Sequence, residues 1–175
     1  MKQQVKELKA FLGVSDSPDE YYSKVKGSCE WIDAREDFQA WRNYDASLTP
    51  EHDTGTRTES ISIFWVHANP GTGKTVLASH VVSRLQELHV DCAFYYFHMG
   101  NKSSSSLSAF LRSVALQMAS SNPTIRERLH KLQQEGSNLD LDDSQAIWMK
   151  IFKKCILQVS SSFPLLAYDP YTILT

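Results

Sequence analysis

Apolar residues recur at three- and four-residue intervals in several stretches of the chain, which is the spacing that places them on one side of a helix. Helices are therefore expected over residues 2–12, 76–88, 107–120, 124–134 and 144–159. The expected boundaries carry helix signals of their own. Ser106 or its neighbour can cap the third helix, and Pro123 stands at the position where the first turn of the fourth tolerates proline.

Short runs of β-branched and aromatic residues indicate strands between these helices. They occupy residues 61–67, 92–97 and 165–168. The second run is apolar nearly throughout, as expected of a strand covered on both faces. A strand, a helix and a strand in this order form a parallel, right-handed unit, so the pattern predicts an α/β fold.

The polar stretches are interpreted as surface. Residues 45–60 are rich in Thr, Ser and acidic residues and predict a linker or loop. A second polar loop, 100–106, follows the second strand, where ligands collect in α/β sheets. Its Lys102 is within reach of a phosphate in principle, but a lone Lys in a Ser-rich loop is more often solvated. A solvated face is likewise predicted for four basic residues of the fourth helix, Arg126, Arg128, His130 and Lys131.

The segment between the first strand and its helix has the pattern of a phosphate-binding loop, with Ala68 where glycine is usual. Gly71 and Gly73 let the backbone bring its N–H groups close to phosphate oxygens, and the following helix points its N-terminus at the same anion. Lys74 supplies a charge to the outer phosphates, and the Thr75 hydroxyl is placed to hold magnesium. The alternative is a glycine-rich turn that binds nothing. The predicted nucleotide-binding residues are Asn69, Pro70, Gly71, Thr72, Gly73, Lys74 and Thr75.

A second candidate magnesium ligand stands near the end of the chain. The apolar run 163–168 ends in Asp169, and a carboxylate in this position holds the metal through water in phosphoryl-transfer sites. Many buried strands also end in Asp. Two tryptophans, Trp31 and Trp41, are candidates for stacking on a nucleotide base, but core packing is the favoured interpretation because large aromatic side chains are mostly buried.

Composition narrows the classes of function. The 175 residues are 42% hydrophobic and carry a net charge of −2, which is typical of a globular domain and gives no bulk attraction to nucleic acid or acidic membranes. Three widely spaced cysteines lack zinc-ligand spacing and predict reduced thiols. The N-terminus has no signal-peptide run, and no stretch is long enough to span a membrane. A cytoplasmic protein is expected.

Several segments together resemble the nephrocystin-like N-terminal, NACHT-type domain of large, mostly fungal, STAND-class signalling NTPases. The leader 27–32 with Phe38 and Trp41 is similar to the Gly-Thr-Cys-x-Trp-Ile…Phe…Trp segment of that family. Residues 111–117, Leu-Arg-Ser-Val-Ala-Leu-Gln, resemble its Leu-Arg-Ser-Leu-x-x-Gln helix, and 125–129 a later helix. The phosphate loop alone is generic, whereas the leader and the Leu-Arg-Ser helix are specific to the family.

The resemblance implies a three-layer parallel sheet of the P-loop NTPase kind, incomplete at the C-terminus, with a helical leader and linker over 1–60 and the NTPase part over 61–175. It also implies binding of ATP or GTP with magnesium, and self-association with other STAND-type proteins. In such NTPases the strand before the phosphate loop does not pair with the next two strands in sequence. Strand 61–67 is therefore expected to lack its neighbours unless it pairs directly with 165–168.

The resemblance ends after Asp169, where the family continues with an acidic pair and this chain continues with Pro170. A truncated form with weak or no hydrolysis is therefore expected, and no catalytic base is identified. Two other functions remain open from the sequence. One is a small nucleotide kinase, and the other is a non-enzymatic interaction fragment.

Overall fold

The computed structural model describes residues 2–14, 27–42, 64–90, 92–97, 105–136 and 139–159, together with the backbone of 165–168. The chain divides into two compact units, one comprising Met1–Glu20 with Val82–Thr175 and the other Tyr21–Val81. The division falls within helix α3 (Lys74–Glu87). The loop predicted at 45–60, Lys102 and Asp169 lie outside the described residues.

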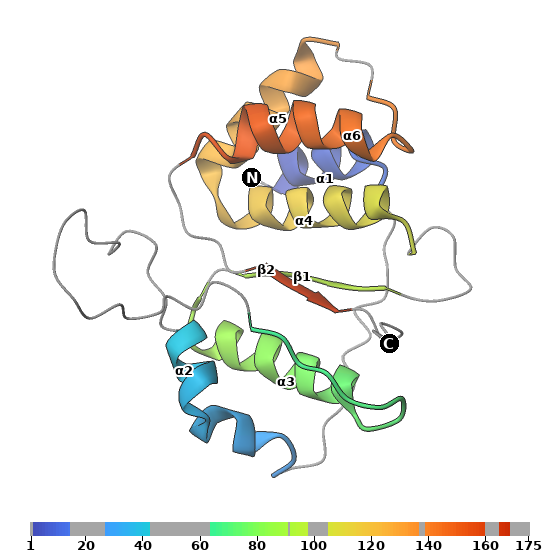
Figure 1. The fold of residues 1–175 in the computed structure, drawn as a ribbon. Helices are drawn as coiled ribbons and strands as arrows, with labels where there is room; N and C mark the ends of the chain where they lie inside the picture. Colours follow the sequence, from blue (N-terminus) through green and yellow to red (C-terminus); the bar gives the residue numbers. More distant parts are fainter. Residues whose placement is uncertain are drawn as a thin grey trace, which may run out of the picture. The chain divides into compact units, whose positions relative to one another are not determined.

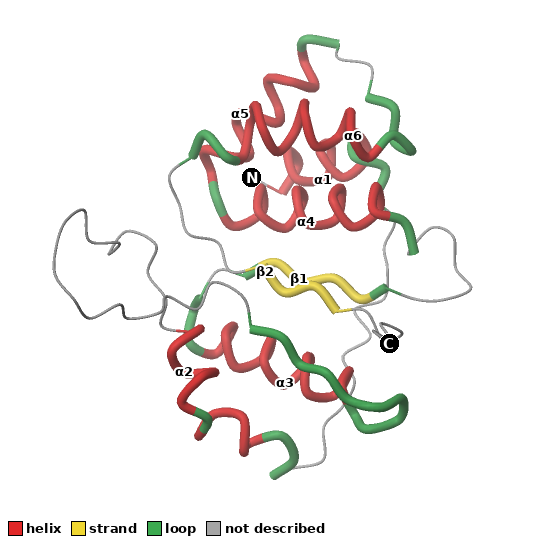
Figure 2. The backbone as a smooth tube through the Cα atoms, viewed as in Figure 1, coloured by secondary structure: helices red, strands yellow, loops and turns green. Residues whose placement is uncertain are grey.

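Helix dominates the part of the chain that the structure describes, and its strands are β1 (Ala93–Tyr96) and β2 (Leu165–Tyr168) (Figures 1 and 2). These two strands pair in parallel, with Ala93 opposite Leu165 and Tyr96 opposite Tyr168. The prediction of a three-layer parallel sheet is therefore wrong. The pairing of 61–67 with 165–168 that the sequence left open is not formed by any described residue.

The absence of a larger sheet among the described residues is explained by the segment before the phosphate loop. Residues 64–67 form no strand, and 61–63 lie outside the described residues. An apolar, β-branched run predicts burial and extended geometry, but a strand exists only where its backbone N–H and C=O groups meet a second strand. The predicted buried strand is therefore wrong for residues 64–67, where Trp65 is 61% and Val66 is 41% exposed.

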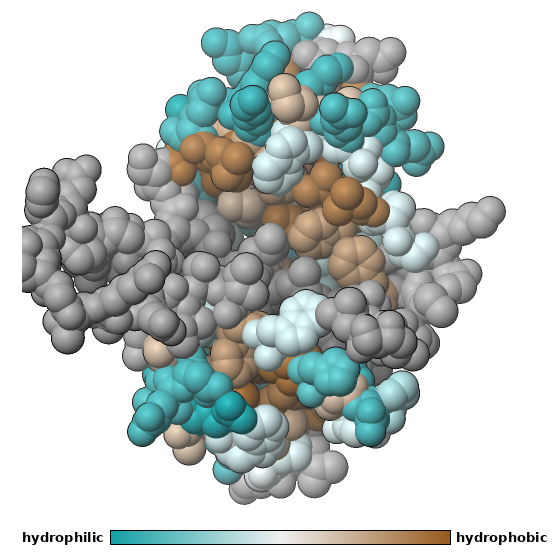
Figure 3. Space-filling view, in the orientation of Figure 1, coloured by the Kyte–Doolittle hydropathy of each residue, from teal (hydrophilic) through white to brown (hydrophobic). Residues whose placement is uncertain are grey.

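The first unit packs its helices on one side of the β1–β2 pair, with α4 nearest to the strands (Figure 1). These helices are α1 (Lys2–Phe11), α4 (Leu107–Ser121), α5 (Pro123–Gln134), α6 (Ser144–Ile147) and the π-helix η3 (Trp148–Ile156). Their positions confirm the predicted helices to within a few residues. The face shown in Figure 3 has hydrophilic side chains over the outer helices of this unit and apolar ones over α4, where Leu107 is exposed.

Side-chain caps set the starts of three helices in this unit. The Ser106 hydroxyl accepts a hydrogen bond from the backbone N–H of Ala109 and caps α4, as the sequence predicts. Asn122 caps α5 in the same way, with Pro123 in the first turn. The Asp143 carboxylate accepts from two N–H groups at the start of α6. Each cap satisfies donors that have no acceptor within the helix.

The core of the first unit joins α1, α4, α5 and η3 to β1. Its buried members are Leu8, Leu12, Ala93, Leu111, Val114, Ala115, Ala119, Ile125, Leu129, Ile147, Ile151, Phe152, Cys155 and Ile156. The last helix of this core departs from regular α geometry, because α6 continues into the nine-residue π-helix η3. Runs of that length are rare, and the 3.6-residue period of the sequence gives no signal of one.

Lys131 is exposed as the sequence predicts, but the other three basic residues of α5 are buried or half-buried and do not form the predicted solvated face. Arg126 is only 8% exposed, and its guanidinium donates to the carbonyls of Ala119 and Ser120 at the end of α4. His130 lies 3.2 Å from the carboxylate of Glu7 in α1. The prediction was wrong because the last carbonyls of a helix need donors, and a guanidinium can supply them from a neighbouring element.

The second unit begins with a short leader, the 3₁₀ helix η1 (Glu30–Ala34) followed by α2 (Glu36–Arg42). Phe38 is 1% exposed and is the aromatic centre of this unit. Its ring centroid lies 5.6 Å from those of Trp41 and Phe64. Trp41 is therefore packed among aromatic rings, as the sequence predicts. This cluster joins the leader to the segment that precedes the phosphate loop.

No helix within the described part of the chain combines the length and the apolar character needed to cross a membrane.

Candidate functional site

The loop between residues 68 and 73 turns sharply into α3, which begins at Lys74. Gly71 and Gly73 adopt φ values of 80° and 85°, in the left-handed region that favours glycine. A Cβ atom built on either glycine would meet nothing within 4 Å. Glycine is therefore required here by the backbone conformation and not by crowding, and the space beside both residues is open.

Hydrogen bonds within the loop hold this shape. The Thr72 hydroxyl donates to the Asn69 carbonyl at 2.7 Å, and the Thr72 backbone N–H points to the same oxygen at 3.4 Å. The Lys74 ammonium donates to the carbonyls of Ala68 and Asn69, at 2.8 Å each. An ammonium has three N–H donors, so these two bonds fix the charge at the loop and leave one donor for an anion.

The start of α3 adds a second source of positive potential. The first intrahelical bond runs from the Leu77 N–H to the Gly73 carbonyl, at 3.0 Å. The N–H groups before Leu77 have no acceptor within the helix, and the dipole of the helix is positive at this end. A charged ammonium, open space beside two glycines and a helix N-terminus thus converge on one loop, which suits a phosphate group.

Of the two predicted magnesium ligands, Thr75 and Asp169, only Thr75 lies among the described residues. Thr75 lies in the first turn of α3 and is half-buried. Asp169 lies outside the described residues, so the structure does not bring the pair together within the part of the chain it describes. A hydroxyl at the first turn of a helix that follows a phosphate loop fits the oxygen-rich coordination of magnesium. Thr75 is accordingly the described residue that would contribute to holding the ion.

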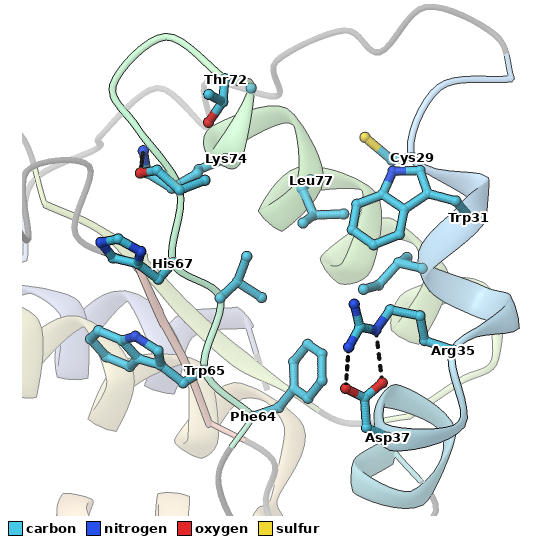
Figure 4. Close-up of a pocket in the computed structure, with 14 residues that line it drawn as sticks. Cys29, Trp31, Arg35, Asp37, Phe64, Trp65, His67, Thr72, Lys74 and Leu77 are labelled. Carbon is cyan, nitrogen blue, oxygen red and sulfur yellow. Dashed lines mark hydrogen bonds and ion pairs between the residues drawn. The ribbon is translucent and has the colours of Figure 1, made fainter.

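A pocket of about 320 Å³ adjoins the loop within the second unit. Its walls come from the leader, from the segment before the loop, from the loop itself and from α3 (Figure 4). The lining residues are Cys29, Trp31, Ile32, Arg35, Asp37, Phe64, Trp65, Val66, His67, Ala68, Thr72, Gly73, Lys74 and Leu77. The leader that carries the sequence resemblance therefore forms one wall of the pocket beside the phosphate loop.

Trp31 overturns the core-packing interpretation made from the sequence. Its side chain is 56% exposed, whereas the adjacent Ile32 is 1% exposed. The 3₁₀ turn of η1 directs the isoleucine inward and leaves the indole on the pocket wall, which Leu77 also lines (Figure 4). Only one of two adjacent residues on a single helical turn can face the core, and here the smaller one does.

The segment before the loop presents its side chains to opposite sides. Phe64 points toward the leader, where its ring packs on Phe38 and Trp41. Trp65 and His67 point away from the leader (Figure 4). This alternation places Phe64 on the side of the segment that faces the leader. There its ring forms an apolar part of the pocket wall.

An ion pair closes the end of the pocket that is remote from Lys74 (Figure 4). Arg35 and Asp37 form two parallel hydrogen bonds, Nε to Oδ1 at 2.8 Å and Nη2 to Oδ2 at 2.5 Å. The hydrogen bond from Arg35 lowers the pKa of the Asp37 carboxyl below its ordinary value, and the same bond raises the pKa of Arg35. The carboxylate stays ionised, and the guanidinium beside it offsets its charge, so the pair adds no net negative charge to the pocket.

A further contact joins the leader to α3. The Nε2 atom of His80, a side chain only 4% exposed, lies 3.1 Å from Oδ2 of Asp33 in η1. The other oxygen of Asp33 is buried without a hydrogen-bond partner. The contact ties the element that carries Trp31 to the helix that begins at Lys74.

The sequence identified the loop but missed most of the pocket. Cys29, Arg35 and Asp37 match no chemical motif and were not assigned to a site, and Trp31 was considered for base stacking but assigned to the core. One local signal was present, because the leader begins with a glycine at position 27 that adopts φ 84°, followed by Cys29 at φ 70°. Left-handed residues of this kind mark a tight turn, and here the turn leads into η1, with Cys29 as its N-cap residue.

The comparisons with known proteins give one result. Neither the search of curated proteins nor the search of solved structures found a match. The family model described as nephrocystin 3, N-terminal, matches residues 27–167. This span includes the leader, the phosphate-loop segment, α3, α4 and α5. The chain therefore belongs to the nephrocystin 3 N-terminal family.

Proposed function

We propose that the chain binds a nucleoside triphosphate, ATP or GTP, with magnesium, as the nucleotide-binding module of a NACHT-type signalling NTPase of the STAND class. The loop 69–75 holds the phosphates, and Thr75 contributes to magnesium binding. One observation carries the proposal. Two left-handed glycines precede a helix N-terminus whose first residue, Lys74, has its ammonium held inside the loop.

The chemistry of this arrangement favours a polyphosphate over other anions. A full charge and several backbone N–H groups face the same open space, and charge-assisted hydrogen bonds are roughly twice as strong as neutral ones. The Lys74 charge is fixed by two carbonyls before any ligand arrives, so little ordering entropy is lost on binding. The net charge of −2 gives no general attraction for anions, so affinity rests on this loop.

Slow turnover is part of the proposal. Phosphoryl transfer to water requires a residue that orients the nucleophile. Asp37 is the one carboxylate that lines the pocket, and both of its oxygens accept hydrogen bonds from Arg35. Among the described residues, the loop thus has groups that bind phosphates. The pocket beside it has no carboxylate that is free of the Arg35 hydrogen bonds. We infer that the module binds and exchanges nucleotide far more readily than it hydrolyses it.

The test compares the wild-type chain with Lys74→Ala by isothermal titration calorimetry, using ATP and GTP with magnesium. A hydrogen bond to a charged group contributes about 1.5–3 kcal/mol, so the variant should bind roughly 10- to 150-fold more weakly. Lys131→Ala serves as the matched control, because Lys131 is an exposed lysine of α5 that does not line the pocket. Equal affinity of the wild type and Lys74→Ala, or no binding by the wild type, would disprove the proposal.

A further inference from the structure

We propose that the pocket beside the loop takes the purine nucleoside of the ligand, with Trp31 as the surface on which the base stacks. The inference rests on the proposed function, and it assigns a role to a leader residue that no phosphate-loop motif includes. Three observations support it. They are the placement of the pocket, the exposure of one aromatic ring, and the ion pair at the far end.

The pocket continues from the phosphate loop without leaving the second unit. Thr72, Gly73 and Lys74 line it together with Trp31 and Arg35. A ligand whose phosphates lie at Lys74 therefore has its remaining part directed along this cavity. The volume of about 320 Å³ falls at the lower end of the range for small-molecule sites and suits a nucleoside.

Trp31 is suited to a base and not to the protein core. The indole is 56% exposed while it lines a cavity whose wall also includes Leu77 (Figure 4). Stacking between a base and an aromatic side chain is favourable for every base, and a purine offers the larger ring. Phe64 adds an apolar surface to the same cavity, while Ile32, next to Trp31 and 1% exposed, anchors η1 in the core.

The Arg35–Asp37 pair supplies the polar end of such a site. Nucleotide pockets combine apolar walls with a few groups that form hydrogen bonds. The pair lies at the end of the cavity opposite to Lys74 and offers both N–H donors and carboxylate oxygens (Figure 4). Because donors and acceptors occur side by side, the pair complements the polar edge of adenine and of guanine alike. The structure therefore favours purines without choosing between them.

The experiment compares ATP, UTP and inorganic tripolyphosphate on the full chain, each with magnesium and each against its own wild-type value. Replacing Trp31→Ala should weaken ATP binding roughly 5- to 150-fold, the range expected for loss of one stacked base. Tripolyphosphate should bind the variant as it binds the wild type. The wild type should prefer ATP to UTP, and the variant should lose most of that preference. Trp31→Phe keeps an aromatic face and should retain most of the ATP affinity.

Trp148→Ala is the matched control, because Trp148 is a 44% exposed tryptophan of η3 that is not among the lining residues. A second measurement uses no variant. Cys29 lines the pocket, so ATP should slow its alkylation, measured by peptide mass spectrometry, more than tripolyphosphate does. Unchanged ATP affinity in Trp31→Ala, or equal losses for ATP and tripolyphosphate, would overturn the inference while leaving the phosphate site intact. Failure of the wild type to bind any of the three ligands would instead overturn the proposed function, and this inference with it.

Discussion

The side-chain amide of Gln117 pairs with the backbone of Phe94 through two hydrogen bonds. Its oxygen accepts from the Phe94 N–H at 3.1 Å, and its nitrogen donates to the Phe94 carbonyl at 2.8 Å. The amide thus takes the place of a neighbouring strand at this residue of β1. Because both backbone groups of Phe94 are engaged, this position of β1 is closed to a further strand.

Gln117 belongs to the helix segment 111–117 that makes the family resemblance specific, and so does Arg112. The Arg112 guanidinium donates to the carbonyls of Leu12 and Gly13 just after α1, at 3.0 and 2.8 Å. The Arg112 and Gln117 side chains of this motif therefore hold backbone groups within the first unit. The motif identifies the architecture of that unit, whereas the phosphate loop and the leader carry the candidate site.

Replacing Gln117→Ala should lower the free energy of unfolding by about 1–3 kcal/mol, because it leaves the Phe94 backbone groups without these partners. Gln117→Glu keeps an oxygen that accepts from the Phe94 N–H but places a carboxylate oxygen against the Phe94 carbonyl, so it should not restore the wild-type stability. Urea denaturation monitored by circular dichroism measures both values. Gln134→Ala, at an exposed position of α5, should change the free energy by less than about 0.5 kcal/mol. A Gln117→Ala variant as stable as this control would contradict the assigned role.

The sequence predicted the helices well because their signals are local. The cap at Ser106 and the proline at 123 mark helix boundaries by chemistry that acts within one turn. The sheet prediction failed because pairing is not local. Residues 64–67 have strand composition and no strand partner among the described residues, and Gln117, which engages Phe94, stands 23 positions away in the sequence.

Gly73→Ala should weaken triphosphate binding. The loss of affinity should be larger than the accompanying loss of folding stability can explain. Alanine at φ 85° costs roughly 1–2 kcal/mol in backbone strain, and relief of that strain moves the N–H groups of the loop. Gly136→Ala is a matched control, since Gly136 has φ 66° and similar open space but follows α5. Calorimetric titration and thermal unfolding of both variants separate the two effects. Both should lose stability, and only Gly73→Ala should lose affinity.

The buried thiol of Cys155 should make the free energy of unfolding of the chain decrease at alkaline pH. Burial raises the pKa of its thiol above the ordinary value. Below about pH 8.5, the ordinary thiol pKa, the group is neutral in both states and has no effect. As pH rises above that value, the unfolded chain ionises the thiol before the folded chain does, so the unfolded state is favoured.

Urea denaturation at pH 7 and pH 9.5 tests this expectation. The loss of stability between the two pH values should be smaller in Cys155→Ala than in the wild type, although the variant is less stable at both because it leaves a cavity. In the folded wild type at pH 8, iodoacetamide should modify Cys29 faster than Cys155, since Cys29 lines the pocket and Cys155 is buried. An identical pH dependence in the two proteins would rule out a contribution from this thiol.

The candidate site was predictable only where its residues act through a contiguous motif. The loop 69–75 is such a motif, and its glycine and lysine positions follow from the spacing. Trp31 and Asp33 lie about 40 positions earlier, and their placement depends on how η1 packs against α3. No periodicity distinguishes an exposed tryptophan from a buried one in a helix of five residues, because such a helix has no complete second turn.

The contact between His80 and Asp33 should control how firmly the leader is held. Replacing Asp33→Ala removes the acceptor that lies 3.1 Å from a ring nitrogen on a side chain only 4% exposed, which should cost about 1–3 kcal/mol. If the contact fixes the leader on α3, the backbone N–H groups of 27–42 should exchange with deuterium faster in the variant, while those of α4 keep their wild-type rates. Glu36→Ala, at an exposed residue of α2, provides the control and should leave both regions unchanged.

ATP should also bind Asp33→Ala more weakly than the wild type, because the element carrying Trp31 is loosened, whereas tripolyphosphate binding at the loop should be nearly preserved. Wild-type exchange rates throughout 27–42 in Asp33→Ala would show that the leader is held by the Phe38, Trp41 and Phe64 rings alone.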